Sequence, residues 1–229
     1  MISKILVGCP TSQYQDYCLD SYAKVVSNLT YSNYDILLVD NSKDDKYYNK
    51  LKKIGIPVIK GPWFEGARDR IVESRNILRK TALDKNYDYF LSLEQDVIPP
   101  KDVIQRLLSH KKDVVSGLYF NYNTVDGKNI LVPMLWGKAK KEDEILFIDS
   151  KSVIRNSVIS VGACGLGCVL INKKVLEKVK FRYDPKKDSF DDMYFSLDVH
   201  SNGFDILADT SVKCKHLIKE RHLWDDVKK

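Results

Sequence analysis

The fold of this chain is decided by one stretch, Tyr34-Asp35-Ile36-Leu37-Leu38-Val39-Asp40-Asn41-Ser42. Its apolar run predicts a buried strand, and the acid and two small polar residues at its end predict a loop. A similar run, Ile5 to Cys9, ends at Pro10 and Thr11, and Tyr17 to Leu29 carries apolar residues at helical spacing. Strand, helix and strand in this order predict a βαβ unit, whose two strands lie parallel in one sheet.

The rest of the chain continues this alternation and then becomes mixed. Further strands are predicted at residues 57–60, 89–93 and 113–119, with a helix over residues 66–84. Residues 121–158 show weak periodicity, and we expect them to be rich in loops. After a glycine-rich segment at 162–167, the remaining predicted elements are a strand at 168–171, helices at 173–179 and 191–202, the second ended by Gly203, and a strand at 204–208.

This order of elements predicts an α/β fold with a mostly parallel central sheet flanked by helices. We expect a single domain over residues 1–217, followed by a C-terminal tail at 218–229. In such a sheet, ligands bind outside the carboxyl ends of the strands.

Composition excludes several classes of protein. The 229 residues are 44% apolar and 30% charged, the balance of a globular protein with one core, so disorder, collagen and coiled coil are excluded. Lys and Arg outnumber Asp and Glu by 37 to 31, but no long basic run is present. The net charge of +6 favours anionic partners such as phosphate-bearing substrates or acidic lipid, and we expect no nucleic-acid partner.

Cysteine usage and apolar runs bear on the compartment. The five cysteines are odd in number and include no C-x-x-C pair, which argues against a disulfide framework and a zinc ribbon. The longest uncharged stretch, residues 156–172, is interrupted by glycines and falls short of the roughly 20 apolar residues of a spanning helix. We therefore expect a cytoplasmic protein without a membrane span, compatible with peripheral contact with a membrane.

Two carboxylates follow the strand predicted at 89–93. In Glu94-Gln95-Asp96 they lie two residues apart on an extended segment, so they point the same way and can share a hard divalent cation. A solvated turn is the alternative, because an acid-x-acid triplet after a strand is common. Alone, this triplet does not decide between them.

Three further features are also ambiguous when taken singly. Asp40-Asn41-Ser42 can hold a ribose or a base at a strand end, or simply start a turn. Asp191 and Asp192 open a predicted helix, where acids also serve as an N-cap or as partners of the helix dipole. His216 is either a metal ligand or an ordinary, partly buried histidine. The order of these features along the chain carries more information than any one of them.

Together they resemble the glycosyltransferases of the GT-A fold, in particular the large inverting family 2 type. Gly8-Cys9-Pro10-Thr11 is similar to the loop that ends the family's first strand, and Val39-Asp40-Asn41-Ser42 to the second strand end, whose acid holds the nucleoside. Ser74-Arg75-Asn76 is similar to the A-R-N element before the central strand, and Glu94-Gln95-Asp96 to the D-x-D metal motif. The glutamate is a departure from that motif.

The resemblance continues through the second half and covers residues 4–217. Val161 to Ile171 is similar to the family's glycine-rich acceptor-side loop and the strand after it. Asp191-Asp192, with Gly203-Phe204 further on, resembles the element that supplies the catalytic base, with Asp191 in place of a glutamate. His216 lies where many such enzymes place a further metal ligand.

The resemblance implies a Rossmann-like GT-A fold and inverting transfer of a sugar from a UDP- or GDP-sugar to a glycan, lipid-linked or protein acceptor, with Mn²⁺ or Mg²⁺. Asp96 and His216 are then expected to ligate the metal, and the histidine favours Mn²⁺. Glu94 is a third candidate at the metal and, as the departure from the motif, is expected to bond to the sugar or ribose, or to metal-bound water. Asp192 is the expected general base, with Asp191 as the alternative. The residues expected at the nucleotide are Pro10, Thr11, Asp40, Asn41, Arg75, Glu94 and Gln95.

Two other functions stay open. A nucleotidyltransferase also needs a cation and a nucleotide site at strand ends, but its first loop is normally rich in glycine and basic residues, and Gly8 to Gln13 contains no basic residue. A non-catalytic sugar- or partner-binding domain would use aromatic stacking surfaces, although aromatic residues are more often part of the core. The candidates for such surfaces are Tyr119, Tyr122, Trp136 and Trp224.

Overall fold

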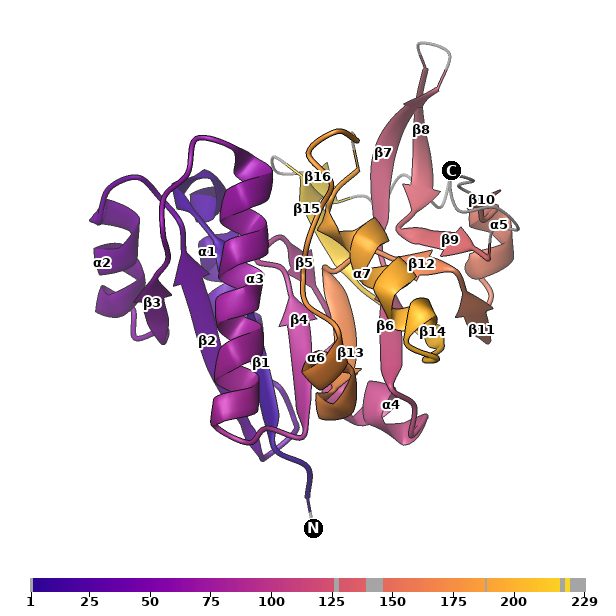
Figure 1. The fold of residues 1–229 in the computed structure, drawn as a ribbon, viewed down its shortest axis with the longest axis horizontal. Helices are drawn as coiled ribbons and strands as arrows, with labels where there is room; N and C mark the ends of the chain where they lie inside the picture. Colours follow the sequence, from indigo (N-terminus) through magenta and orange to yellow (C-terminus); the bar gives the residue numbers. More distant parts are fainter. Residues whose placement is uncertain (1, 126–127, 139–145, 188, 219–220, 223–229) are drawn as a thin grey trace.

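The computed structural model describes residues 2–125, 128–138, 146–187, 189–218 and 221–222, and Figure 1 shows its course. Within these residues, eight strands form the central sheet: β1 Ile5–Thr11, β2 Tyr34–Asp40, β3 Val58–Lys60, β4 Tyr89–Leu93, β6 Val114–Leu118, β11 Val158–Val161, β13 Cys168–Asn172 and β14 Ile206–Lys213. The helices are η1 Gln13–Cys18, α1 Leu19–Val26, α2 Lys46–Lys53, α3 Ala67–Asp84, α4 Val103–Ser109, α5 Ser150–Val153, α6 Lys173–Lys178 and α7 Asp191–Ser201. The smaller strands are β5 Val97–Ile98, β7 Phe120–Val125, β8 Lys128–Pro133, β9 Leu135–Gly137, β10 Leu146–Phe147, β12 Ala163–Cys164, β15 Lys215–Ile218 and β16 Arg221–His222.

The central sheet is mixed but mostly parallel, with the strand order β11-β14-β6-β13-β4-β1-β2-β3. The neighbours β4, β1, β2 and β3 are parallel to one another, and so are β6 and β14. Strand β13 lies antiparallel between β4 and β6, and β11 is antiparallel at the edge. The structure thus confirms the predicted α/β class with a mostly parallel sheet flanked by helices.

Helices cover both faces of this sheet. Because successive residues of a strand point to opposite faces, β1 contributes to two separate cores. Leu6 packs with Leu78 of α3 and with residues of α6 and α7, which lie on one face of the sheet in Figure 1. Val7 packs on the other face with Tyr22 of α1 and Leu107 of α4. Burial on both sides explains why the strand sequences are continuous apolar runs.

Residues 121–158 differ from the prediction, because they are not mainly loops. They hold most of the hairpin formed by β7 and β8, then β9, β10, α5 and the start of β11. Figure 1 shows the hairpin extending away from the central sheet. Strand β7 alternates apolar and polar residues only over Phe120 to Asn123, and β8 shows no such alternation, so the hairpin gives a weak strand signal.

Helices α2 and α4 are also absent from the sequence prediction. Helix α2 is rich in lysine, and Tyr47 and Leu51 are its buried residues. The helix is only eight residues long and four of them are lysines, so the segment is too short and too polar to stand out as a helix of the core. By contrast, α7 ends as predicted, with Gly203 following it at a φ of 79°.

The predicted boundary at residue 217 stays a prediction. Strand β15 crosses this position, and it pairs with β5 on one side and with β16 on the other. Residues 219–220 and 223–229 of the predicted tail lie outside the described residues. In the part of the chain that the structure describes, no helix is both long and apolar enough to cross a membrane.

Candidate functional site

Two neighbouring pockets lie where β1, β2 and β4 reach their carboxyl ends. The first, here the β1 pocket, has a volume of about 330 Å³, and its lining includes Pro10, Thr11, Asn41, Arg75, Glu94 and Gln95. The second, here the α7 pocket, has a volume of about 360 Å³, and its lining includes Arg75, Glu94, Tyr119, Trp136, Asp191 and Asp192. Ile71, Arg75 and Glu94 line both pockets, which therefore share a wall.

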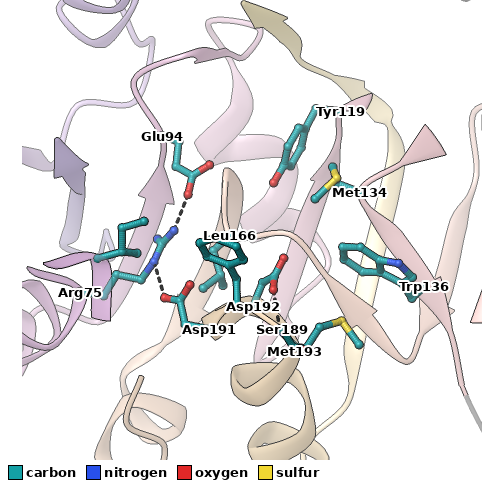
Figure 2. Close-up of a pocket in the computed structure, with 12 residues that line it drawn as sticks. Arg75, Glu94, Tyr119, Met134, Trp136, Leu166, Ser189, Asp191, Asp192 and Met193 are labelled. Atoms are coloured by element: carbon teal, nitrogen blue, oxygen red, sulfur yellow. Dashed lines mark hydrogen bonds and ion pairs between the residues drawn. The ribbon is translucent and has the colours of Figure 1, made fainter. Parts of the chain in front are cut away.

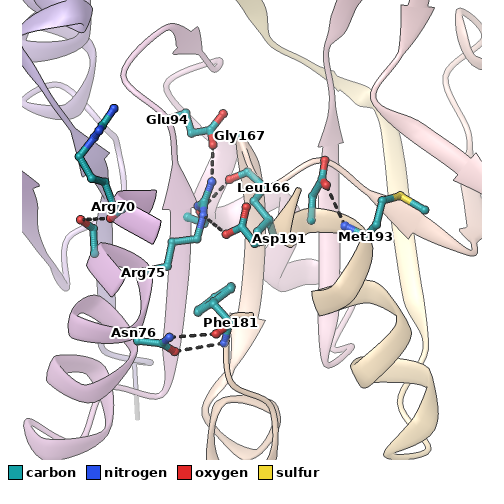
Figure 3. A network of polar contacts seen from close by, with 12 residues as sticks. Arg70, Arg75, Asn76, Glu94, Leu166, Gly167, Phe181, Asp191 and Met193 are labelled. Atoms are coloured by element: carbon teal, nitrogen blue, oxygen red, sulfur yellow. Dashed lines mark hydrogen bonds and ion pairs between the residues drawn. The ribbon is translucent and has the colours of Figure 1, made fainter. Parts of the chain in front are cut away.

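Arg75 is the central residue of the shared wall, as Figure 3 shows. Its Nε lies 2.8 Å from Oδ2 of Asp191, its Nη1 donates to Oγ of Ser92 at 2.8 Å, and its Nη2 donates to Oε1 of Glu94. The side chain is only 3% exposed. Burial works to lower the pKa of Arg75, but the adjacent carboxylates of Asp191 and Glu94 raise it above its usual value. The guanidinium is therefore charged and already bound by protein groups.

Asp191 and Asp192 are neighbours in sequence but point in different directions (Figure 2). The Asp191 side chain is 5% exposed and faces Arg75. Asp192 faces the α7 pocket, and its Oδ1 accepts a hydrogen bond from the backbone N–H of Met193 at 2.8 Å. Burial and the nearby charges of Asp191 and Glu94 raise the pKa of Asp192 to about 7. Such a carboxyl group is about half ionised at neutral pH and can accept a proton from a bound hydroxyl.

Asp96 and His216 are brought together by the pairing of β15 with β5. Nδ1 of His216 lies 2.7 Å from the carbonyl oxygen of Phe120, which can only accept, so Nδ1 carries a proton. Nε2 faces Oδ2 of Asp96 at 3.5 Å. Burial works to lower the pKa of His216, but the Asp96 carboxylate raises it above its usual value.

The other oxygen of Asp96, Oδ1, is buried and has no hydrogen-bond partner within the described ranges. Glu94, the third residue predicted at the metal, directs its carboxylate to Arg75 instead. Burial raises the pKa of Glu94, and Arg75 opposes this rise. Among the described residues, no three His, Cys, Asp or Glu side chains gather as a metal site. The protein itself thus brings two candidate ligands together, Asp96 and His216.

Gln95, which we expected at the nucleotide, lines the β1 pocket but is only 1% exposed. Its Oε1 accepts a hydrogen bond from Oγ1 of Thr11 and lies 3.0 Å from the hydroxyl of Tyr47. Its Nε2 donates to the carbonyl oxygen of Gln15 at 2.7 Å. The side chain therefore connects the segment after β4 to the end of β1, to helix η1 and to helix α2. Tyr47 has no counterpart in the sequence prediction, because α2 itself was missed.

Asp40 and Asn41 occupy different positions at the end of β2. Asp40 is 0% exposed, and its carboxylate accepts hydrogen bonds from the hydroxyl of Ser42 at 2.6 Å and from Nζ of Lys60 at 2.8 Å. Asn41 lines the β1 pocket, and its side chain donates to Oγ of Ser74 at 3.2 Å. A contact between Asp40 and a nucleoside stays a prediction.

The apolar lining of the α7 pocket includes residues that the sequence did not place at the site. Tyr119 and Trp136 were candidates for stacking surfaces, whereas Met134 and Met193 carried no signal. The hydroxyl of Tyr119 accepts a hydrogen bond from the N–H of Gly167 at 3.0 Å, and a Cβ on that glycine would collide with the tyrosine ring. The glycine-rich segment therefore leaves room for Tyr119. Trp224, another stacking candidate, lies outside the described residues.

No protein-family model and no curated protein matches the sequence. Solved structures do match. A197 from STIV has a TM-score of 0.51 at 20% identity, over 95% of this chain and 87% of that one. S. aureus TarS has a TM-score of 0.58 at 15% identity, and GalNAc-T7, solved with UDP, GalNAc and Mn²⁺, has 0.63 at 12%. The chain has the GT-A fold.

The likeness extends over nearly the whole chain but only over part of two of these proteins. The matches to TarS and GalNAc-T7 cover 92% and 96% of this chain, but only 36% and 45% of theirs. At these sequence identities the likeness shows the fold alone.

Proposed function

We propose that this chain is a metal-dependent glycosyltransferase that moves a sugar from a nucleoside diphosphate to an acceptor hydroxyl, with inversion at the anomeric carbon. One observation carries the proposal: Asp192, a partly buried carboxyl group with a raised pKa, lines a pocket that shares a wall with a second pocket at the strand ends of a GT-A fold. Strand ends in open α/β sheets are where nucleotides bind. Two pockets with one common wall suit a transfer between two substrates.

The β1 pocket is the proposed site of the nucleoside diphosphate. Its lining includes small and polar residues that follow β1 and β2, among them Pro10, Thr11 and Asn41, together with Arg70. Contact of Arg75 with a phosphate stays a prediction. A UDP-sugar is the first donor to test, because GalNAc-T7, a protein of the same fold, was solved with UDP, and a GDP-sugar is the second.

Asp96 and His216 are the proposed ligands of Mn²⁺ or Mg²⁺. A buried carboxylate oxygen without a donor, such as Oδ1 of Asp96, is unfavourable alone and fits a cation as its partner. His216 offers Nε2 and favours Mn²⁺. A bound divalent ion would supply Lewis-acid stabilisation of the negative charge on the leaving diphosphate. Because Glu94 already contacts Arg75, we assign it to the donor sugar or ribose rather than to the metal.

The proposed reaction is a single displacement. The oxygen of the acceptor hydroxyl attacks C1 of the donor sugar, and the bond from C1 to the diphosphate oxygen breaks, its electron pair leaving with the diphosphate. The hydroxyl proton passes to Asp192. Attack from the side opposite to the leaving group inverts the configuration at C1. A general base typically contributes about 10² to 10⁴ in rate.

Donor turnover and nucleotide binding test this proposal. The purified chain is incubated with UDP-glucose, UDP-N-acetylglucosamine, UDP-N-acetylgalactosamine or GDP-mannose, with Mn²⁺ or with EDTA, and release of the nucleoside diphosphate is measured. We expect slow release from one donor that depends on the metal and is lost in Asp192→Asn. The matched control is Asp198→Asn, on the same helix but at an exposed ion pair with Arg182.

The alternatives give different results in this assay. Release of pyrophosphate from a nucleoside triphosphate and a sugar phosphate would indicate a nucleotidyltransferase. Absence of any metal-dependent nucleotide binding, by calorimetry with UDP and GDP, would refute the transferase and leave a binding domain. The configuration of the product at C1, measured by NMR, decides between inversion and retention.

A further inference from the structure

The α7 pocket has two chemically different walls, and this contrast bears on the acceptor. On one side lie Tyr119, Met134 and Trp136, which are aromatic or contain sulfur, and Figure 2 shows Met134 and Trp136 on the side away from Arg75. On the other side lie carboxylates, with Glu94 and Asp191 next to Arg75. A ligand of this pocket therefore needs one apolar face and a polar edge.

The charges of the lining disfavour an anionic acceptor. Among the residues that the structure describes, the lining carries three acidic side chains, those of Glu94, Asp191 and Asp192, and one cation, Arg75. The positive charge of Arg75 is already balanced by Glu94 and Asp191, so it adds little attraction for an anionic group of an acceptor in this pocket. An anion placed here would meet like charges in a partly desolvated pocket, which opposes binding.

The backbone at Trp136 is held in a small sheet. It lies on β9, the middle strand of a three-stranded sheet, and pairs with Phe147 of β10 and Ala163 of β12. Its carbonyl oxygen also accepts a hydrogen bond from the N–H of Gly162 at 2.8 Å. Because the backbone that carries the indole is paired on both sides, this segment does not have to be ordered when a ligand packs on Trp136.

An uncharged pyranose sugar has the required two-faced character, because its C–H groups form an apolar face and its hydroxyl groups lie at the edge. We propose that the α7 pocket binds an uncharged sugar residue of the acceptor, with a C–H face of the ring on Trp136 and the nucleophilic hydroxyl directed to Asp192. This inference rests on the proposed function and selects a glycan from the glycan, lipid-linked and protein acceptors that the sequence left open.

A matched pair of small glycosides tests the charge argument. Methyl β-D-glucopyranoside and methyl β-D-glucopyranosiduronic acid differ by a carboxylate in place of a hydroxymethyl group. The same pairing is made for galactose, and the methyl glycosides of mannose and N-acetylglucosamine are added. Affinity is measured by NMR titration of the full chain with UDP and Mn²⁺. We expect at least one uncharged glycoside to bind. Of the glucose and galactose pairs, we take the one whose uncharged glycoside binds more tightly. In that pair, the uronide should bind about tenfold more weakly than the uncharged glycoside.

Substitution of Trp136 tests the stacking argument. Trp136→Ala should weaken binding of the uncharged glycoside about tenfold, and Trp136→Phe, which keeps a smaller ring, should weaken it less. The matched control is Trp63→Ala, because Trp63 is 39% exposed and lines neither pocket. Unchanged UDP affinity in calorimetry shows that each Trp136 variant is folded.

The proposal is overturned if a uronide binds as tightly as its uncharged partner, if Trp136→Ala has no effect, or if none of the uncharged glycosides binds. Transfer to a serine peptide or to a polyprenyl phosphate in preference to the glycosides would also overturn it. Failure of the transferase proposal is separate, because it shows as absence of metal-dependent UDP binding in the β1 pocket. Binding of glycosides to the α7 pocket without UDP binding would support the sugar-binding site but not the transferase.

Discussion

The buried Arg75 allows a quantitative test of the electrostatics of the shared wall. Arg75→Met keeps most of the apolar stem but removes the charge, and leaves the carboxylates of Asp191 and Glu94 without their cation. Removing one partner of a buried ion pair costs about 3–5 kcal/mol. Asp191 is 5% exposed, but Glu94 is 32% exposed and can be solvated in part, so the lower end applies. We expect a loss of about 3 kcal/mol in the free energy of unfolding at pH 7.5.

This loss of stability should be larger at high pH than at low pH. In the variant, the folded state holds two carboxylates whose ionised forms are unfavourable, so it binds protons more readily than the unfolded state does. Stability of the variant should therefore rise as the pH falls toward about 4, the usual pKa of a carboxyl group, where both states become protonated. The difference from the unsubstituted chain is largest above pH 7 and shrinks in acid.

Urea unfolding followed by circular dichroism at pH 7.5 and 5 measures both effects. The matched control is Arg182→Met, because Arg182 makes a two-bond ion pair with Asp198 but is 51% exposed, and such pairs contribute about 0–1 kcal/mol. The double variant Arg75→Met/Asp191→Asn should recover part of the loss, since the more deeply buried charge is gone. A loss below about 1 kcal/mol at pH 7.5, or no recovery in the double variant, refutes the assignment of Arg75 as the buried counter-ion.

Three further predictions concern individual side chains. Asp192→Asn should lower turnover by about 10² to 10⁴ while UDP affinity is kept. In the unsubstituted chain, the rate should rise with pH through about 7 as this carboxyl group loses its proton. A flat rate profile from pH 5 to 8.5 would contradict this. Asp96→Asn and His216→Ala should each weaken Mn²⁺-dependent UDP binding in calorimetry, and unchanged binding in both would remove the metal assignment. Gln95→Ala should lower the free energy of unfolding by about 1–3 kcal/mol, because it leaves buried hydrogen-bond partners unsatisfied, and an unchanged urea midpoint would show that its network is not stabilising.

The strands of the central sheet were the part of the fold that could be predicted best from the sequence. Residues 34–40 and 89–93 form strands as predicted, since their buried parts give the sequence a recognisable apolar run. Helix α2 and the hairpin of β7 and β8 were missed because they contribute few residues to the core. Because few of their side chains are buried, the periodicity of apolar residues in their sequences is weaker than in the central strands.

Part of the candidate site was also accessible from the sequence, for a topological reason. Parallel strands end at the same edge, so residues just after β1, β2 and β4 must lie near one another, and Thr11, Asn41 and Glu94 do line one pocket. The partners of these residues could not be foreseen. Gln95 contacts Tyr47 and Thr11 instead of solvent. This depends on the packing of α2, which no local sequence pattern reveals.

The distinction between Asp191 and Asp192 shows most clearly where sequence reasoning ends. Adjacent residues on a helix are rotated by about 100° from each other, so two acids at a helix start cannot face the same partner. The sequence therefore shows that the two acids face different partners. Which of them meets Arg75 depends on how the first turn of α7 is rotated against α3. The structure shows Asp191 against the guanidinium and Asp192 at the pocket. The charge of Asp191 contributes to the raised pKa of Asp192, which makes Asp192 the better candidate base.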